Sequence, residues 1–512
     1  MMHGKSSPLH RFKAATCLSM LVLASLGSVA SAQSPAPDFA NQLRRDAQAV
    51  HDDIAANHPG MVNALDAGFA KRNDDALALA LARAAKVRDF SGYWYALRAY
   101  GASFDDGHLN ISLIDGAPPT PAAWPGFLTG YDSYGDQRVL TREADAPVPL
   151  GAKLLECDDR IAGDLSAANV GAFTGRWFLS AVRVRRGGEL FVDRGNPYAP
   201  RPSHCDFDFE GKTIAVDTQW RAIDADALRE RLAVTSQTSA IPIGTHKLWD
   251  GTRWFNLGSF NGDPASSAGQ RLPALISDMK LDRANIVAAP AIVLDLRGNG
   301  GGSSDWSRQI AEVLWGHPRV AALEDAKTYV EWRTSDANIA SLSETRESMR
   351  RGGAPSPEVM AWLDRAISGM QAAKARGEAL WREPPDPVYN PIVKTDVVQT
   401  KTPIFFVTDA GCGSACLDAA DLWRALGAIQ IGQSTSADTD YMDIRHGRLP
   451  SGIAQVAVPM KVYRGRERGS NVPLEPVHRF PGDLRDSEAL ERWVPTLPEV
   501  RKRTSPTTFG AS

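Results

Sequence analysis

Hydrophobic residues in the first part of the chain recur at helical spacing. They form two series, which are Leu43, Ala47, Val50 and Ile54, and then apolar positions between residues 77 and 85. This spacing places apolar side chains on one face of a helix. The sequence therefore predicts an N-terminal helical region at residues 33–114. We expect that region to end in a turn at Gly107 and His108, followed by a short strand.

The pattern changes between residues 115 and 245, where short alternating runs are separated by glycine, proline and aspartate. This pattern is typical of a small β-rich domain. Within it, residues 149–157 read Pro-Leu-Gly-Ala-Lys-Leu-Leu-Glu-Cys. This stretch resembles one strand of a PDZ domain with its approach turn. Two interpretations stay open, a β-rich domain of other function and a peptide-binding PDZ-like domain.

From residue 246 to 500 apolar strands alternate with amphipathic helices, which indicates an α/β core. Two short apolar runs, at 291–296 and 404–408, predict buried strands, and residues 417–426 predict a helix after the second. Residues 317–400 are more polar and predict a largely helical insertion.

Composition narrows the class of protein. The 512 residues include 57 Lys and Arg against 60 Asp and Glu, a formal net charge of −3, and 43% are hydrophobic. These values are typical of a globular protein with several domains. They give no reason to expect nucleic-acid binding.

The N-terminus resembles a secretory signal peptide at residues 1–32. Three basic residues precede an apolar run at 14–26, and Ala30-Ser31-Ala32 provides a cleavage site before Gln33. The alternative is a membrane anchor, but the run is shorter than the roughly 18 residues that a spanning helix needs. We expect a periplasmic or secreted protein without a membrane span.

Four cysteines follow this segment: Cys157, Cys205, Cys412 and Cys416. An even number in an oxidising compartment permits disulfides, with three possible connectivities. Pairing neighbours along the chain, Cys157 with Cys205 and Cys412 with Cys416, is the simplest arrangement, and buried thiols are the alternative. A Cys-x-x-x-Cys spacing without further ligands does not predict zinc.

A run of glycines follows the first buried strand, in the sequence Asp295-Leu-Arg-Gly-Asn-Gly-Gly-Gly302. Consecutive glycines let the backbone approach a ligand and expose N–H groups. The run lacks the pattern of a dinucleotide fingerprint and the Gly-Lys-Ser/Thr of a phosphate loop. It indicates an oxyanion-binding turn or, alternatively, a tight structural turn.

Ser414 stands between the second buried strand and its helix. A serine at a helix N-terminus can serve as a nucleophile, because the free N–H groups stabilise developing negative charge. It can equally be an N-cap. The Gly-x-Ser-x-Gly turn of α/β-hydrolases is absent, since Cys412 and Cys416 occupy both glycine positions.

The third chemical signal is Asp105-Asp106-Gly107-His108. A histidine on a glycine turn after two acids is suited to be an oriented base, although a lone histidine is more often structural.

Together these motifs resemble the tail-specific (C-terminal processing) serine peptidases, a group that includes the tricorn core protease. The matching segments are residues 106–108, 292–301, 409–415 and 432–435. The resemblance implies a crotonase- or ClpP-like spiral α/β core with Ser414 as nucleophile. It also implies an oxyanion hole made by the N–H groups of Ala415 and of Gly300 or Gly301.

This chain differs from many members of that family in the residue that would serve as the general base. Members with a Ser-Lys dyad carry their lysine where this chain has Asp438, and Lys461 is the reserve candidate. The tricorn-core branch uses an N-terminal histidine, which His108 matches. A glutamate near the C-terminal end completes that arrangement, and Glu475 or Glu467 is the candidate.

We therefore expect an exported serine peptidase that acts on peptides or proteins by a Ser-His mechanism, without metal or organic cofactor. Two alternatives stay open. One is a non-catalytic ligand- or peptide-binding protein on the same fold, and the other is an esterase. The sequence does not predict an oligomeric state.

Overall fold

The computed structural model describes residues 37–132, 134–237, 239, 241–323, 328–352, 357–384 and 401–504. The expected signal peptide at residues 1–32 lies outside these ranges. Within them, no helix combines the length and apolar character needed to cross a bilayer.

The N-terminal region is helical, as its apolar spacing predicts. It consists of α1 (Phe39–Asn57), the 3-10 helix η1 (Pro59–Val62), α2 (Phe69–Ala84) and α3 (Phe90–Ala102). Asp89 caps α3 by accepting the Gly92 N–H at 2.9 Å. The predicted apolar series on α1 is fully buried against the other helices.

The central sheet has the strand order β10-β11-β12-β15-β16-β19 and is parallel except for β10. Its strands are β10 (Gly244–Lys247), β11 (Arg253–Asn256), β12 (Ile292–Asp295), β15 (Ile404–Thr408), β16 (Ile429–Gly432) and β19 (His478–Arg479). Every residue of β12 and β15 is buried, which confirms these two predicted strands. Such continuous apolar runs are expected where helices cover both faces of a parallel sheet.

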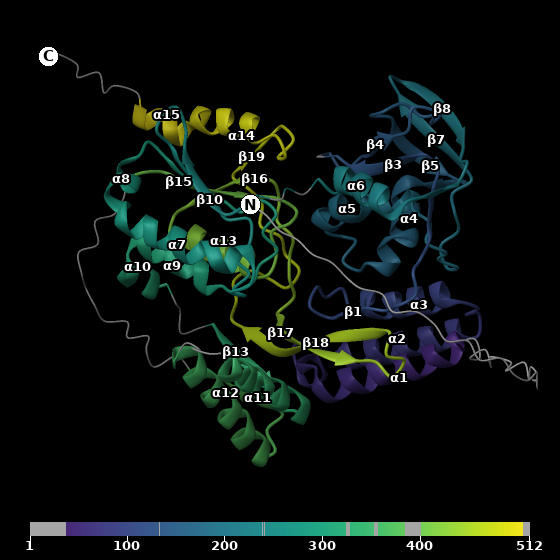
Figure 1. Cartoon of the computed structure of the whole chain (residues 1–512), viewed down its shortest axis with the longest axis horizontal. Coiled ribbons are helices and arrows are strands. Elements are labelled where there is room, and N and C mark those ends of the chain that lie inside the picture. Colours follow the sequence, from purple (N-terminus) through teal and green to yellow (C-terminus); the bar gives the residue numbers. More distant parts are fainter. Residues whose placement is uncertain are drawn as a thin grey trace, which may run out of the picture. The chain divides into compact units, whose positions relative to one another are not determined.

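Helices cover the two faces of this sheet (Figure 1). One face carries α7 (Ser267–Leu281), α8 (Arg283–Ala288), α9 (Asp305–Trp315), α10 (His317–Ala321) and α13 (Ala415–Ala425). The other carries α14 (Ser487–Trp493), η4 (Val494–Thr496) and α15 (Pro498–Thr504). The α/β class expected from the sequence is therefore confirmed.

A second sheet is built around the long strand β18 (Ala454–Arg464), which pairs with three other strands. Its partners are β1 (Asn110–Leu113), β13 (Tyr329–Arg333) and β17 (Tyr441–Arg448), and β14 (Leu380–Arg382) extends the sheet beyond β13. Because β1 follows His108 closely and pairs with β18, this pairing places the His108 turn next to the C-terminal part of the chain.

The described part of the segment at 317–400 is mostly helical, and it contains two strands that the sequence does not predict. It contains α11 (Asp336–Arg351) and α12 (Pro357–Ala375), but it also contributes the strands β13 and β14. These strands are short, and β13 is stabilised by its pairing with β18 and by Trp332, which packs among α11 and α12. Residues 324–327, 353–356 and 385–400 of this segment lie outside the described ranges.

The β-rich region contains a sheet in the order β3-β4-β5-β7-β8. Its elements are β2 (Ala122–Trp124), β3 (Phe127–Tyr131), β4 (Gln137–Arg142), β5 (Lys153–Cys157), β6 (Arg160–Ile161), α4 (Ala162–Asn169), η2 (Gly171–Phe173), α5 (Ser180–Arg186), η3 (Gly187–Phe191), β7 (His204–Phe209), β8 (Lys212–Asp217), β9 (Arg221–Ile223) and α6 (Ala225–Ser236). The predicted disulfide between Cys157 and Cys205 is confirmed, and it joins directly paired positions of β5 and β7.

Strand β3 lies at one edge of this sheet, yet all five of its residues are buried. Gly130 of β3 lies against the Thr235 carbonyl of α6, and the Gln237 side chain bonds to the Tyr131 carbonyl. A peptide that adds a strand to a sheet needs an open edge. These contacts from α6 and Gln237 lie on the edge of β3 that such a peptide would use, and the PDZ-like interpretation stays a prediction.

His58 joins the N-terminal helices to β17. Its side chain is fully buried, and its Nδ1 accepts the Gly60 N–H at 2.9 Å. The ring stacks on Phe69 with 4.2 Å between centroids and meets the edge of Tyr441 at 4.7 Å. Its Nε2 has no hydrogen-bond partner in the part of the chain that the structure describes.

This environment predicts a stability that depends on pH. Burial, assisted by the charge of Arg72, holds the pKa of His58 well below its usual range. An unfolded chain binds the proton near about pH 6.5, so the contribution of His58 is complete above that pH and is lost below it. We expect it to fall by about 1.4 kcal/mol per pH unit below 6.5.

Denaturant unfolding of the wild type and of His58→Gln, from about pH 8 to 5, measures this effect. The stability advantage of the wild type should shrink as the pH falls. An advantage that does not change with pH would contradict the prediction.

Candidate active site

Ser414 forms the sharp turn between β15 and α13. Its backbone has φ 53° and ψ −128°, a conformation that costs a residue with a side chain about 1–3 kcal/mol. Ser414 occupies the N-cap position of α13, but its hydroxyl makes no capping hydrogen bond to the helix. A strained strand-to-helix turn that presents a serine hydroxyl is typical of a nucleophile.

Two contacts hold this turn in place. The predicted disulfide between Cys412 and Cys416 is confirmed, and both cysteines are fully buried on either side of the serine. The Ser414 N–H donates to Asp438 Oδ2 at 2.7 Å. The Cys412–Cys416 disulfide therefore occupies the two positions at which an α/β-hydrolase has glycines.

The glycine run lies directly against the serine. Gly301 has φ 102°, and a Cβ on it would lie 2.7 Å from Ser414 Cβ and 2.9 Å from the Ala415 nitrogen. Only glycine fits there. The Gly301 N–H already donates to Asn299 Oδ1 at 2.9 Å, so Gly301 is excluded as an oxyanion donor. Its lack of a side chain instead leaves room for the Ser414 turn.

Two other N–H groups of the predicted oxyanion hole are free. Within the described ranges, the amides of Gly300 and Ala415 have no hydrogen-bond partner. Asp409 fixes the loops that carry them, because its carboxylate accepts the Gly298 N–H at 2.9 Å and the Gly411 N–H at 2.8 Å. Burial raises the pKa of Asp409, and these two N–H groups partly offset that effect.

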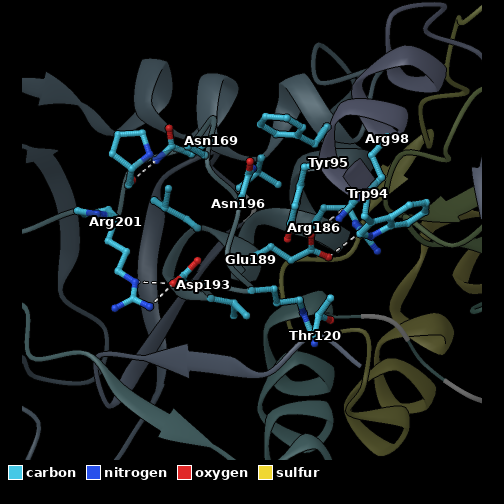
Figure 2. A pocket seen from close by; sticks show the side chains of 18 of the residues that line it. Trp94, Tyr95, Arg98, Thr120, Asn169, Arg186, Glu189, Asp193, Asn196 and Arg201 are labelled. Atoms are coloured by element: carbon cyan, nitrogen blue, oxygen red, sulfur yellow. Dashed lines mark hydrogen bonds and ion pairs between the residues drawn. The ribbon is translucent and has the colours of Figure 1, made fainter. Parts of the chain in front are cut away.

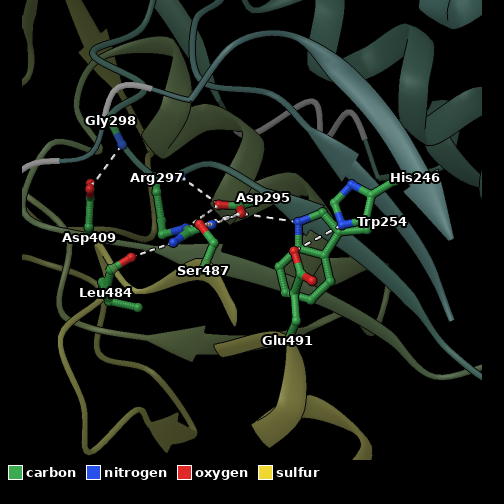
Figure 3. A network of polar contacts seen from close by, with 9 residues as sticks. All are labelled: His246, Trp254, Asp295, Arg297, Gly298, Asp409, Leu484, Ser487 and Glu491. Carbon is green, nitrogen blue, oxygen red and sulfur yellow. Dashed lines mark hydrogen bonds and ion pairs between the residues drawn. The ribbon is translucent and has the colours of Figure 1, made fainter. Parts of the chain in front are cut away.

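The Asp-Leu-Arg sequence before the glycines has a structural role that sequence reasoning missed. Arg297 and Asp295 form a fully buried ion pair with 2.6 Å between Nη2 and Oδ2. Trp254 donates to the same carboxylate at 3.1 Å. Arg297 also bonds to the Leu484 carbonyl and, at 3.1 Å, to the Ser487 hydroxyl (Figure 3). The network ties the end of β12 to the start of α14.

His108 lies on the turn before β1, and its nearest acid is Asp106. Asp106 Oδ1 accepts the His108 backbone N–H at 2.8 Å and lies 3.9 Å from the ring Nδ1. His108 Nδ1 and Asp106 Oδ2 are buried without a hydrogen-bond partner among the described residues. Burial raises the pKa of Asp106, and the charge of His108 acts in the opposite direction.

Hydrogen bonds connect the His108 turn with the Ser414 turn. The Asn471 side chain donates to the Asp105 carbonyl at 2.8 Å, and its backbone N–H donates to the Asp438 carbonyl at 2.7 Å. Asp438 in turn holds the Ser414 N–H. The structure thus brings the turn with the predicted base to the segment that supports the predicted nucleophile.

Arg176, from the β-rich region, is a further link that the sequence did not indicate. Its backbone N–H bonds to the Asp105 carboxylate, and its Nη1 donates to the Ala437 carbonyl at 2.8 Å. A Cβ on Gly107 would lie 2.7 Å from the guanidinium. Gly107 therefore leaves room for Arg176 beside the histidine, which the local sequence alone could not reveal.

Lys461 is not arranged as a neutral base. Its Nζ pairs with Asp443 at 2.7 Å and lies 5.0 Å from the centre of the Trp332 ring. Burial alone would lower the pKa of Lys461, but Asp443 and Tyr463 outweigh it and raise the pKa above its usual value. The side chain is therefore an ammonium group, which cannot accept a proton from serine.

The structure does not bring the predicted glutamates to His108. Glu475 is 59% exposed and accepts hydrogen bonds from the Ser434 hydroxyl and, at 3.1 Å, from Arg479. Glu467 is exposed. Among the described residues neither contacts His108.

Comparisons with known proteins concern the family and the fold of the chain. Residues 256–464 match the model of peptidase family S41. The crystal structure of mature CPAF superposes with a TM-score of 0.57 at 13% identity, over 91% of this chain and 99% of that chain. Mature CPAF complexed with lactacystin gives 0.56 at 12% identity, over 91% and 98%. A comparison with curated proteins found no match.

The family match and the α/β core together define a serine-type peptidase. The match to the S41 model is confined to residues 256–464, and the similarity to mature CPAF extends to the fold of the chain.

The buried pair of Asp295 and Arg297 predicts a large effect on stability. Arg297→Met should lower the free energy of unfolding by about 3–5 kcal/mol, because it leaves a buried carboxylate without its cation. The chain supplies a matched control with the same spacing, since Asp483 and Arg485 form a 2.6 Å pair that is partly exposed. Arg485→Met should cost less than about 1 kcal/mol. Equal effects in denaturant unfolding would contradict this account.

Proposed function

We propose that the chain is an exported peptidase in which Ser414 is the nucleophile and His108 the general base. The observation that carries this proposal is the Ser414 turn, whose hydroxyl does not cap the helix and which packs directly against Gly301, next to the free N–H groups of Gly300 and Ala415 in the sequence. Assignment to the histidine-dependent branch rests on the links between the His108 and Ser414 turns and on the ion pair that occupies Lys461.

In the first step the Ser414 hydroxyl attacks the scissile carbonyl carbon while His108 accepts its proton. The carbonyl oxygen becomes an oxyanion and accepts hydrogen bonds from the Gly300 and Ala415 amides. Each such donor is worth about 3–4 kcal/mol in comparable sites. His108 then gives the proton to the leaving amine, which departs and leaves an acyl group on Ser414.

In the second step water attacks the acyl carbon and His108 accepts a proton from it. Ser414 leaves with that proton, and the peptide product carries a new carboxylate. We assign the orientation of His108 to Asp106, because this carboxylate lies beside Nδ1 and can stabilise the imidazolium formed in each step. Glu475 instead holds Ser434 and Arg479.

Export is supported by the two disulfides, since such bonds persist in oxidising compartments. The substrates would then be peptides or proteins of the periplasm or the surroundings of the cell. The family match gives no support to the non-catalytic alternative.

Substitutions at Ser414 should separate activity from stability. Ser414→Ala and Ser414→Gly should both abolish peptide hydrolysis and labelling by a fluorophosphonate probe. Glycine adopts φ 53° without strain, so Ser414→Gly should be about 1 kcal/mol more stable than Ser414→Ala. Retained turnover in either variant would remove Ser414 from the mechanism.

Three variants test the base and its partner. His108→Ala should lower kcat/KM by several orders of magnitude and remove the rise of activity through the pH range where imidazoles titrate. Asp106→Asn should cause a loss of about 10²–10⁴-fold, as expected for an orienting carboxylate. Glu475→Gln is the matched control and should change kcat/KM less than about tenfold. The opposite ranking of Asp106→Asn and Glu475→Gln would restore Glu475 as the third residue.

The Cys412–Cys416 disulfide should matter mainly for kcat, and the Cys157–Cys205 disulfide mainly for stability. The Cys412–Cys416 bridge spans 4 residues around the nucleophile, and the Cys157–Cys205 bridge spans 48. In the chain-entropy picture these closures contribute about 2 and 4 kcal/mol. Replacing Cys412 and Cys416 with serine should therefore reduce kcat at least about tenfold, with a small loss of stability.

Replacing Cys157 and Cys205 with serine is the control, and it should lower stability more while kcat stays within about twofold. An unchanged kcat in the Cys412→Ser/Cys416→Ser variant would contradict a role of that bridge in positioning Ser414.

A further inference from the structure

A cavity of about 400 Å³ lies between α3 and the β-rich region, formed by residues outside the candidate active site (Figure 2). Trp94, Tyr95 and Arg98 of α3 form one wall, and residues of the β-rich region between Thr120 and Leu232 form the others. Volumes of this size are typical of small-molecule sites.

The charges in this cavity are unbalanced. Four arginines line it against two acids, namely Arg98, Arg186, Arg194 and Arg201 against Glu189 and Asp193. Both acids already have close partners, because Glu189 pairs with Arg186 at 2.8 Å and Asp193 pairs with Arg201.

Two guanidinium groups are left with donors for a ligand. Arg98 reaches Glu189 only at 3.8 Å, although its side chain is just 17% exposed. The Arg194 side chain has no hydrogen-bond partner among the described residues. Guanidinium groups bind carboxylate and phosphate oxygens in bidentate fashion, so this part of the cavity is suited to an anion.

Aromatic surfaces lie next to these cations. The Arg98 guanidinium stands 5.4 Å from the centre of the Tyr95 ring, and Tyr95 meets Phe173 edge-on at 5.4 Å. Trp94 and Trp220 also line the cavity. The Tyr95 hydroxyl makes no hydrogen bond within the described ranges, which leaves a neutral donor beside the arginines. Flat apolar walls favour a ring.

Both walls continue directly into the turn that carries His108. Helix α3 ends at Ala102, three residues before Asp105. On the other side Phe173 is followed by Gly175, where a Cβ would lie 2.7 Å from the Ala102 carbonyl, and by Arg176, which bonds to Asp105. A ligand that moves α3 against η2 would therefore move the His108 turn.

We infer that this cavity is a binding site for a small aromatic anion, a flat ring bearing a carboxylate or phosphate, and that its occupancy alters turnover at Ser414. The anion would bind to Arg98 and Arg194 and accept the Tyr95 hydroxyl, with the ring between the aromatic walls. The binding half of this inference is independent of the proposed peptidase mechanism, whereas the effect on turnover rests on it.

Isothermal titration calorimetry of the full chain with benzoate and with phenyl phosphate tests the site. Both should bind saturably, whereas acetate, which lacks the ring, and benzyl alcohol, which lacks the charge, should bind at least about tenfold more weakly. Arg98→Gln and Arg194→Gln should each weaken benzoate at least about tenfold. Arg229→Gln is the matched control, since Arg229 is 75% exposed on α6 and does not line the cavity.

Tyr95→Phe removes one unpaired hydroxyl and should weaken benzoate about threefold to tenfold without unfolding the protein. It serves as the test if Arg98→Gln does not fold. Absence of saturable binding, or equal binding by Arg98→Gln and Arg229→Gln, would overturn the site. Binding of a peptide with a free C-terminus but not of benzoate would overturn the ligand class.

The link to the active site has its own readout. Saturating benzoate should change kcat at least about twofold in the wild type and leave it unchanged in Arg98→Gln. An unchanged kcat in a wild type shown by calorimetry to be saturated would overturn the coupling and leave the site itself intact. Loss of all peptidase activity in Ser414→Ala with benzoate binding retained is the result expected from two separate sites.

Discussion

The pairing of β18 with β1 is the contact on which the proposed catalytic arrangement depends. Ser414 belongs to the central sheet, whereas His108 lies on the N-terminal side of the molecule, and the two are far apart in sequence. Strand β1 leaves the His108 turn and pairs with β18 from Asn110 to Leu113. Because β18 also pairs with β13 and with its sequence neighbour β17, it joins two segments that are distant from it in the sequence. Its valines pack in the same cluster as α1, α2 and α3, so the helices fix β1 from the other side.

Several strong contacts around Ser414 hold strained and unpaired groups in place. A left-handed serine, two free amides and a buried imidazole nitrogen are each unfavourable in isolation. They persist because the disulfide, Asp438, Asp409 and the Asp295–Arg297 pair leave the chain few alternatives. Such preorganisation is what makes N–H groups effective when charge develops on a substrate, since they need not reorient.

The sequence predicted those features that depend on neighbouring residues. The buried strands β12 and β15, the helix α13 and both disulfides could be inferred from apolar runs, helical spacing and cysteine order. The strands β13 and β14 could not, because they are short and β13 is stabilised by pairing with a strand more than a hundred residues away. Similarly, the sequence does not show that the Gly301 N–H donates to the Asn299 side chain. The contacts of Arg176 with the His108 turn, and those of Glu475 with Ser434 and Arg479, depend on tertiary structure alone.

In the proposed mechanism, the β1–β18 pairing also determines when activity can first exist. Ser112 and Gln455, which bond across this pair at 3.2 Å, are separated by 343 residues. Chains are synthesised from the N-terminus, and domains fold as they emerge. A growing chain can therefore form its helices and its β-rich region while its histidine has no strand on which to dock. On this arrangement the enzyme stays inert toward its own unfolded segments, and toward its neighbours during synthesis, until β18 has been made.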